Sequence, residues 1–184
     1  NHSSAASDVY KRQKQDKWIS LKKGDVQIIR AGNGISHAEE LNEKSEIFQI
    51  WFDPNIQLSI TKEASYDDYK SDDFEVIENN GTKTKKIAGK NCPMKIFSEG
   101  IEINSYEIIE KNKLNLQLQN DSVYSYFILD GEGSINNDKI EKGDFFIVSD
   151  SEDLIINTNS KTKIFEIKSP QRPSYNTYSE RFMR

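Results

Sequence analysis

The sequence predicts an all-β protein built of two related barrels, the first of them incomplete. Three observations lead to this fold class. Short runs of β-type residues recur along the chain and are separated by clusters rich in Gly, Asn and Asp. A Lys-Gly-Asp turn followed by a hydrophobic run occurs twice, around Gly24 and around Gly143. A helical pattern of apolar residues is nearly absent.

The clearest strand signal is the alternation of Leu114, Leu116 and Leu118 with polar neighbours, which is typical of a strand with one buried face. We predict strands over residues 26–29, 47–52, 101–109, 114–118, 124–129, 145–148, 154–156 and 163–168. Residues 61–69 are predicted to form one short connecting helix, and the acidic stretch 66–73 a linker.

Composition narrows the function classes. The chain has 184 residues, a net charge of -5 and 35% hydrophobic residues, which is enough for a packed core. No apolar run approaches the roughly 20 residues of a membrane span, so we expect no membrane association. The acidic balance argues against direct contact with nucleic acid, and any such link would pass through a protein partner. Cys92 is the only cysteine, which excludes an intrachain disulfide and favours the cytoplasm.

The first thirteen residues are set apart from the rest by their composition. Residues 3–13 can be back-translated over their whole length into a DNA sequence that resembles the adapter of transposase-based sequencing libraries. We therefore interpret residues 1–13 as non-native and expect the native sequence to begin near Lys14.

The second copy of the repeat includes residues 124–134, a strand, a Gly turn and a strand that resemble the centre of a cupin barrel. The equivalent of Gly131 in the first copy would be Arg12, inside the non-native segment, so we expect the opening strands of the first barrel to be missing. The predicted organisation is a remnant of the first barrel (14–62), a linker (63–86), the second barrel (87–170) and a C-terminal strap (171–184).

The candidate functional residues follow the first Gly-Asp turn. Two glycines in Ala31-Gly32-Asn33-Gly34 allow a tight turn. His37 and Glu39 come next, and two positions apart on an extended segment they point to the same side of a sheet. A neutral imidazole and a carboxylate suit Fe, Mn, Ni, Cu or Zn. The pair is therefore a candidate metal site.

This segment, together with Gln49-Ile50-Trp51, resembles the pirin family, whose members are bicupins. The resemblance implies that His37 and Glu39 bind one divalent transition metal, with iron expected first. It also implies two further His ligands from an upstream His-Pro-His-type segment, which this chain lacks because His2 and His37 are its only histidines. With two ligands the chain itself should bind metal poorly. In the second barrel the repeat aligns His37 with Ile156 and Glu39 with Thr158, so that barrel is predicted to be structural.

Two functions follow from the resemblance. Some pirins resemble cupin quercetinases, in which a metal binds a flavonol and directs dioxygen onto it, and there Glu39 would also be the catalytic base that takes the substrate hydroxyl proton. Others are non-enzymatic, iron-dependent regulators that act on a protein partner. We expect the parent to be a quercetin 2,3-dioxygenase-like enzyme and this fragment to be inactive, with the regulator as the alternative.

Other candidate residues are assigned structural roles. Ser122 and Ser125 have no nearby His for a catalytic triad. Cys92 is expected to be an inert thiol, and the adjacent carboxylates at 67–68 and 72–73 solvated linker charges. Trp18 and Trp51 are predicted core or cover residues of the first barrel, and Tyr175, Tyr178 and Phe182 a strap across a barrel.

Overall fold

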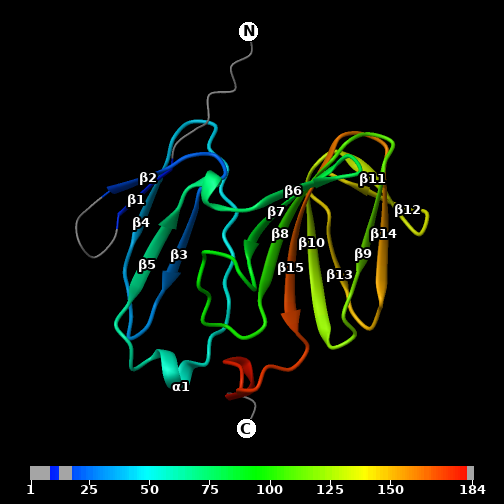
Figure 1. Cartoon of the computed structure of the whole chain (residues 1–184). Coiled ribbons are helices and arrows are strands. Elements are labelled where there is room, and N and C mark those ends of the chain that lie inside the picture. The colour runs from blue at the N-terminus through cyan, green and yellow to red at the C-terminus, as the bar shows by residue number, and fades with distance from the viewer. Residues whose placement is uncertain (1–8, 13–17, 182–184) are drawn as a thin grey trace. The chain divides into compact units, whose positions relative to one another are not determined.

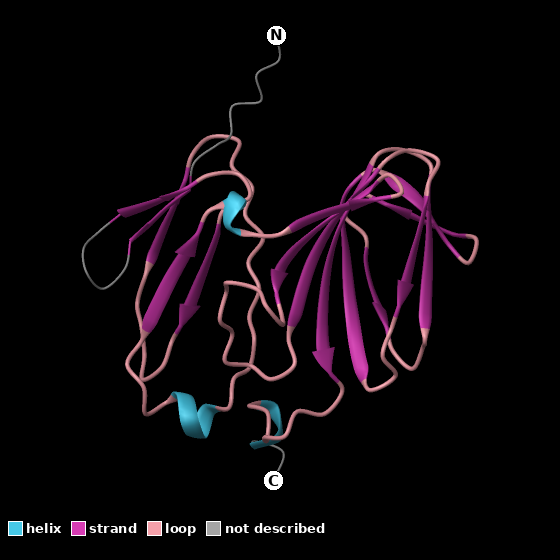
Figure 2. Ribbon diagram, in the orientation of Figure 1, coloured by secondary structure: helices cyan, strands magenta, loops and turns pink. Residues whose placement is uncertain are grey.

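The computed structural model describes residues 9–12 and 18–181, and strands dominate it (Figures 1 and 2). The chain divides into two compact units, one of Asn1–Asp73 with Tyr175–Arg184 and the other of Phe74–Ser174. Within the described residues no helix is both long and apolar enough to cross a membrane. Each unit is described in turn.

The second unit consists of two antiparallel sheets that face each other, the arrangement of a cupin barrel (Figure 1). The larger sheet has the order β13-β10-β15-β8-β7-β6 and the smaller one the order β12-β11-β14-β9. Their bounds are β6 (Val76–Asn79), β7 (Thr82–Ala88), β8 (Glu102–Ile108), β9 (Lys113–Gln117), β10 (Ser122–Asp130), β11 (Glu132–Ile135), β12 (Asp138–Glu141), β13 (Phe145–Val148), β14 (Asp153–Thr158) and β15 (Thr162–Pro170).

A hydrophobic core fills the space between these two sheets. Ile108, Ile128 and Ile164 from the larger sheet and Ile156 from the smaller one are completely buried. Buried and partly exposed residues alternate along β10, because successive side chains of a strand point to opposite faces. The predicted alternation in β9 is confirmed, since Leu114 and Leu118 belong to the core and Leu116 packs against it.

The first unit contains a three-stranded sheet of order β2-β1-β4 and a separate pair β3-β5. Its strands are β1 (Val9–Arg12), β2 (Trp18–Leu21), β3 (Val26–Arg30), β4 (Ala38–Leu41) and β5 (Ser65–Tyr69). Short helical turns complete the chain: α1 (Ile56–Ser59), η1 (Ser71–Asp73) and, near the C-terminus, η2 (Ser179–Arg181). Strand β1 lies in the segment that we interpret as non-native. It pairs with β2 and β4 as β11 pairs with β12 and β14, so it occupies the corresponding place.

The internal repeat is visible in the two Gly-Asp turns. Gly24 and Gly143 both have positive φ, of 84° and 95°. In each turn the carboxylate of the following Asp accepts a hydrogen bond from a backbone amide three residues earlier: Lys22 N donates to Asp25 and Glu141 N to Asp144. The same local geometry therefore precedes β3 and β13, and the first unit is an incomplete copy of the second.

Two predicted elements of the first unit are wrong. Residues 47–52 form no strand. In the second unit β15 pairs with β10 on one side and with β8 on the other, but no described strand lies beside residues 47–52 in this way. A strand without a neighbour leaves its backbone N–H and C=O groups without hydrogen-bond partners. Trp51, in this segment, is 86% exposed, and Trp18, the first residue of β2, is 43% exposed, so neither is a core residue. Residues 61–69 do not form a helix either: they contain β5, which pairs with β3.

The segment 63–86, predicted as a linker, contains β5, β6 and most of β7. Asp67 and Asp68 each pair with a residue of β3, although the Asp67 side chain remains 51% exposed. Asp67 accepts a hydrogen bond from Arg30 at 2.7 Å and Asp68 one from Gln27 at 2.5 Å, both across the β3-β5 pair. At the other end of the chain, Tyr175 donates a hydrogen bond to the carbonyl oxygen of Asp53 and so joins the first unit. Phe182 lies outside the described residues.

Candidate metal-ligand pair

A tight turn between β3 and β4 sets the position of the predicted ligands. Gly34 N donates to Ala31 O at 2.8 Å and closes the turn, and Asn33 N donates to Lys62 O at 2.8 Å. Gly32 has a φ of +52°, and a Cβ there would lie 2.5 Å from the carbonyl oxygen of Lys62. Only glycine fits this position, which confirms the predicted role of the turn.

His37 precedes β4 and Glu39 is its second residue, and their side chains converge as the spacing predicts. His37 Nε2 and Glu39 Oε1 are 3.5 Å apart, and the two side chains are 28% and 17% exposed. Two ligands at about 2.1 Å from one ion in tetrahedral geometry are separated by about 3.4 Å. The pair therefore has the spacing of two adjacent ligands of a single transition metal, at a position that solvent can reach.

The residues described in the structure supply only half of such a centre. No group of three or more His, Cys, Asp or Glu side chains that could hold a metal ion occurs among them. The donor set His37 and Glu39 fits a metal only when further ligands complete it.

The second unit holds no equivalent pair, but the counterparts differ from those predicted. Val9 lies opposite Leu21 and Leu41, as Gly133 lies opposite Ile140 and Thr158. Leu41 is thus the counterpart of Thr158. On this register His37 aligns with Leu154 and Glu39 with Ile156. The sequence had predicted Ile156 as the counterpart of His37 and Thr158 as that of Glu39. The repeat is not in constant register because the segment between the Gly-Asp turn and β4 differs in length from its counterpart. Both counterparts are buried apolar residues, so neither can bind a metal.

Cys92 is not part of any such group. Its side chain is buried, and burial raises the pKa of the thiol. The neutral thiol is a poor nucleophile, in agreement with the inert role predicted from the sequence.

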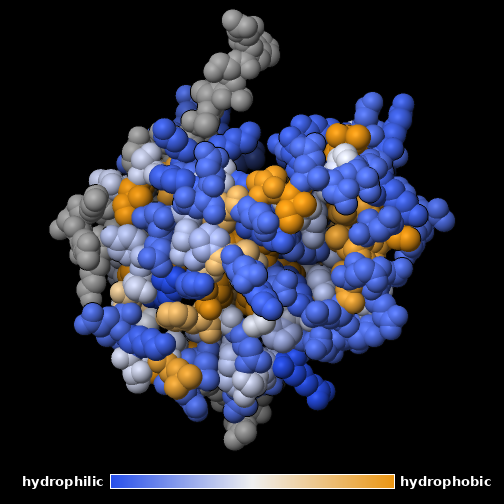
Figure 3. Space-filling view, in the orientation of Figure 1, coloured by the Kyte–Doolittle hydropathy of each residue, from blue (hydrophilic) through white to orange (hydrophobic). Residues whose placement is uncertain are grey.

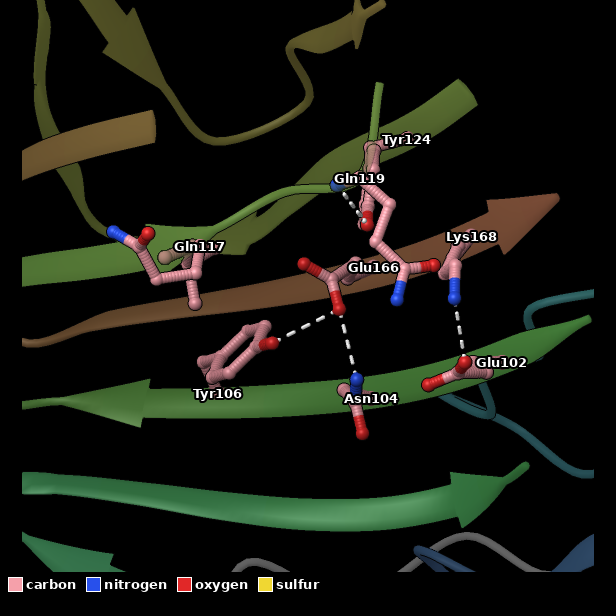
Figure 4. A pocket seen from close by; sticks show the side chains of 9 residues that line it. Glu102, Asn104, Tyr106, Gln117, Gln119, Tyr124, Glu166 and Lys168 are labelled. Carbon is pink, nitrogen blue, oxygen red and sulfur yellow. Dashed lines mark hydrogen bonds and ion pairs between the residues drawn. The ribbon is translucent and has the colours of Figure 1, made fainter. Parts of the chain in front are cut away.

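Sequence reasoning missed a polar site inside the second unit. Glu166 in β15 is 4% exposed, and its Oε1 accepts hydrogen bonds from Asn104 and Tyr106 of β8 (Figure 4). The strand pattern offered a signal, because Glu166 has the same parity as the core residue Ile164 and must point inward.

The visible surface is mostly hydrophilic with scattered apolar patches (Figure 3). The exposed large apolar side chains include Trp51 in the first unit and Phe145 and Ile147 in the second. Single exposed apolar residues are normal on protein surfaces and identify no site by themselves.

The sequence matches no protein-family model and no curated protein. Solved structures do resemble it. Quercetin 2,3-dioxygenase from Acinetobacter baumannii aligns in two crystal structures with TM-scores of 0.73 and 0.76, at 18% and 15% identity and over 89% and 90% of this chain. The alignments cover 61% and 56% of the dioxygenase chain, so the present chain spans less than two thirds of its length.

A second similar structure is the bacterial pirin YhhW from Escherichia coli in complex with nickel(II). It aligns with a TM-score of 0.71 and 18% identity, over 90% of this chain and 69% of the pirin chain. Identities this low define the architecture and leave the chemistry open. The chain therefore has the two-barrel cupin fold of the bacterial pirins, with the first barrel incomplete.

Proposed function

We propose that the intact parent of this chain is a pirin-like, metal-dependent dioxygenase that acts on a flavonol-like substrate, as a quercetin 2,3-dioxygenase does. The observation that carries the proposal is the convergence of His37 and Glu39 at 3.5 Å, on the strand that follows the glycine turn. The fold shared with a quercetin 2,3-dioxygenase and with a nickel-binding pirin supports it. We place the protein in the cytoplasm.

In this proposal His37 and Glu39 bind one divalent metal, with iron as the first choice and Mn, Ni, Cu and Zn as alternatives. The metal would supply the binding of substrate and dioxygen. Glu39 would also accept the proton of the substrate hydroxyl, because an ionised carboxylate within reach of that group is a suitable base. The partial exposure of both side chains gives an aromatic substrate access to them. The fragment itself, with two ligands, is proposed to be inactive.

The test uses the parent gene recovered upstream of Lys14. We expect the purified protein to contain stoichiometric metal and to consume quercetin only in the presence of oxygen. His37→Ala and Glu39→Ala should lose most of the metal and the turnover. Glu40→Gln is the matched control, because Glu40 is the exposed neighbour on the other face of β4 and its substitution should change neither.

Two outcomes would contradict the proposal in different ways. Metal bound without quercetin turnover would favour the alternative, an iron-dependent regulator that acts on a protein partner. A parent protein without metal, or one whose metal content is the same in His37→Ala, would show that the pair is not a ligand set.

A further inference from the structure

The second unit contains a polar pocket between its two sheets, independent of the metal-ligand pair in the first unit. It has a volume of about 190 Å³ and is lined by residues of β8, β9, β10 and β15 and by Gln119, which follows β9 (Figure 4). A cupin barrel closed by core packing alone would leave no polar space of this kind.

The centre of this pocket is the buried carboxylate of Glu166. Its Oε1 accepts hydrogen bonds from Asn104 Nδ2 at 2.8 Å and from Tyr106 Oη at 2.9 Å. The other oxygen, Oε2, points away from β8 in Figure 4. An ionised carboxylate can accept about four hydrogen bonds, so Glu166 retains capacity toward the pocket.

The charge of Glu166 is also uncompensated within the described part of the chain. The one cation that lines the pocket, Lys168, is two residues along β15 and forms its ion pair with Glu102 at 2.6 Å. Of the three charged residues that line the pocket, two are carboxylates, so the lining has one net negative charge. Burial of an unpaired carboxylate costs several kcal/mol, which a positively charged partner would offset.

The neighbouring tyrosines respond to this charge. Burial first, and then the interaction with the Glu166 carboxylate, raise the pKa of the Tyr106 and Tyr126 hydroxyls above the ordinary range. Tyr126 is completely buried, and its hydroxyl lies beside this carboxylate. The Glu166 carboxylate therefore gives the interior of the barrel a negative potential.

We propose that this pocket binds a small organic cation, an amine or a guanidinium compound, whose positive charge pairs with Glu166. A metal ion is a poorer fit, because the described residues offer no group of three metal-binding side chains here. The side-chain amide of Gln119 can bind a hydroxyl or amide group of such a ligand, and the face of Tyr124 can pack against its charged end.

The experiment measures binding to the full chain by calorimetry and by chemical-shift changes, with agmatine and putrescine as cationic probes, glucose as a neutral probe and acetate as an anionic one. We expect saturable binding of at least one cationic probe and none of acetate. Glu166→Gln should weaken that binding by about tenfold or more, because a buried charge pair is lost. Glu110→Gln is the control, since Glu110 lies in an exposed turn outside the pocket and its substitution should leave the affinity unchanged.

A second variant keeps the proposal testable if Glu166→Gln fails to fold. Gln119→Lys places an ammonium group among the lining residues, within reach of Glu166 (Figure 4). This variant should abolish binding of the cationic probes and raise the melting temperature by about 4 °C or more. The proposal is overturned if neither cationic probe binds, if Glu166→Gln or Gln119→Lys leaves their affinity unchanged, or if only glucose binds. None of these outcomes depends on the proposed dioxygenase activity, whose residues lie in the other unit.

Discussion

The hydroxyl groups of Tyr106 and Tyr126 are both buried in the second unit and both lie beside Glu166, but only one forms a hydrogen bond of regular geometry. Tyr106 donates to Glu166 at 2.9 Å, whereas the Tyr126 hydroxyl lies next to the carboxylate without regular hydrogen-bond geometry. Tyr126→Phe should therefore lower the free energy of unfolding by less than about 1 kcal/mol, because the interaction that it removes is weak. Its ring would keep the stacking on Phe146, at a centroid distance of 5.0 Å.

Tyr106→Phe is the matched comparison. It should lower the free energy of unfolding by about 2 kcal/mol, the value of a hydrogen bond to a charged group. Urea denaturation followed by far-ultraviolet circular dichroism measures both changes. Equal losses in the two variants would mean that the Tyr126 hydroxyl is bonded in solution.

At the scale of single residues the sequence predicts the convergence of His37 and Glu39 better than it predicts the pocket. The spacing of His37 and Glu39 alone implies that they share a side, and the 3.5 Å separation confirms it. The hydrogen bonds of Glu166 come from residues some 60 positions away in the chain, so nothing local to β15 identifies them. Parity places Glu166 in the interior, but only the tertiary structure reveals what surrounds it.

At the scale of elements, the turn between β2 and β3 depends on the carboxylate of Asp25. Asp25 accepts hydrogen bonds from the backbone amides of Lys22 and Ser71 and from Lys70 Nζ, at 2.9 to 3.1 Å. Burial by itself raises the pKa of this carboxyl. The hydrogen bonds from Lys70 and from the two backbone amides together lower the pKa by more than burial raises it, so the pKa lies below the ordinary value of 3.8. Because the pKa of Asp25 is lower in the folded than in the unfolded protein, its carboxylate contributes its full stabilisation at pH values above the pKa of the unfolded state. This stabilisation is lost as the pH falls through the pKa of the folded state.

Asp25→Asn should therefore lower the free energy of unfolding at pH 7 by about 2 kcal/mol and weaken the loss of stability below about pH 5. Chemical denaturation of the first unit, followed by the fluorescence of Trp18 and Trp51 across this pH range, checks both effects. Asp144→Asn is the matched control in the repeated turn, where the carboxylate accepts one backbone hydrogen bond, from Glu141. A loss as large in Asp144→Asn as in Asp25→Asn would contradict the assigned role of Lys70 and Ser71.

Elements with an apolar alternation could be predicted, and elements defined by distant partners could not. Strand β13 has the bounds expected from Phe145-Phe146-Ile147-Val148. Strand β7 was missed because its first five residues, Thr82 to Lys86, are all Thr or Lys and offer little apolar signal. The sequence predicted a helix and a linker where β5 lies, because this segment is acidic. It forms a strand because Asp67 and Asp68 pair with residues of β3, which are distant in the sequence.

At the scale of the whole molecule, the repeated Gly-Asp turn made the two-unit architecture predictable. The boundary between the units was not, because strands β6 and β7 extend the large sheet of the second unit beyond the predicted start at residue 87. The first unit has a pair of strands where the second has a six-stranded sheet. The second unit thus contains the more complete core, and it should be the more stable part of the chain.

A comparison of two fragments tests this division. The fragment 74–174 should fold alone and unfold in one cooperative step, because it contains both sheets and the core between them. The fragment 87–170 lacks β6, most of β7 and Phe74, a side chain that is 4% exposed in the structure, and it leaves the edge of β8 unpaired. It should be less stable by at least about 2 kcal/mol, the value of burying one Phe side chain. Urea denaturation of the two fragments measures the difference. If both unfold at the same urea concentration, β6 and β7 add nothing to the second barrel and the boundary predicted from the sequence is the better one.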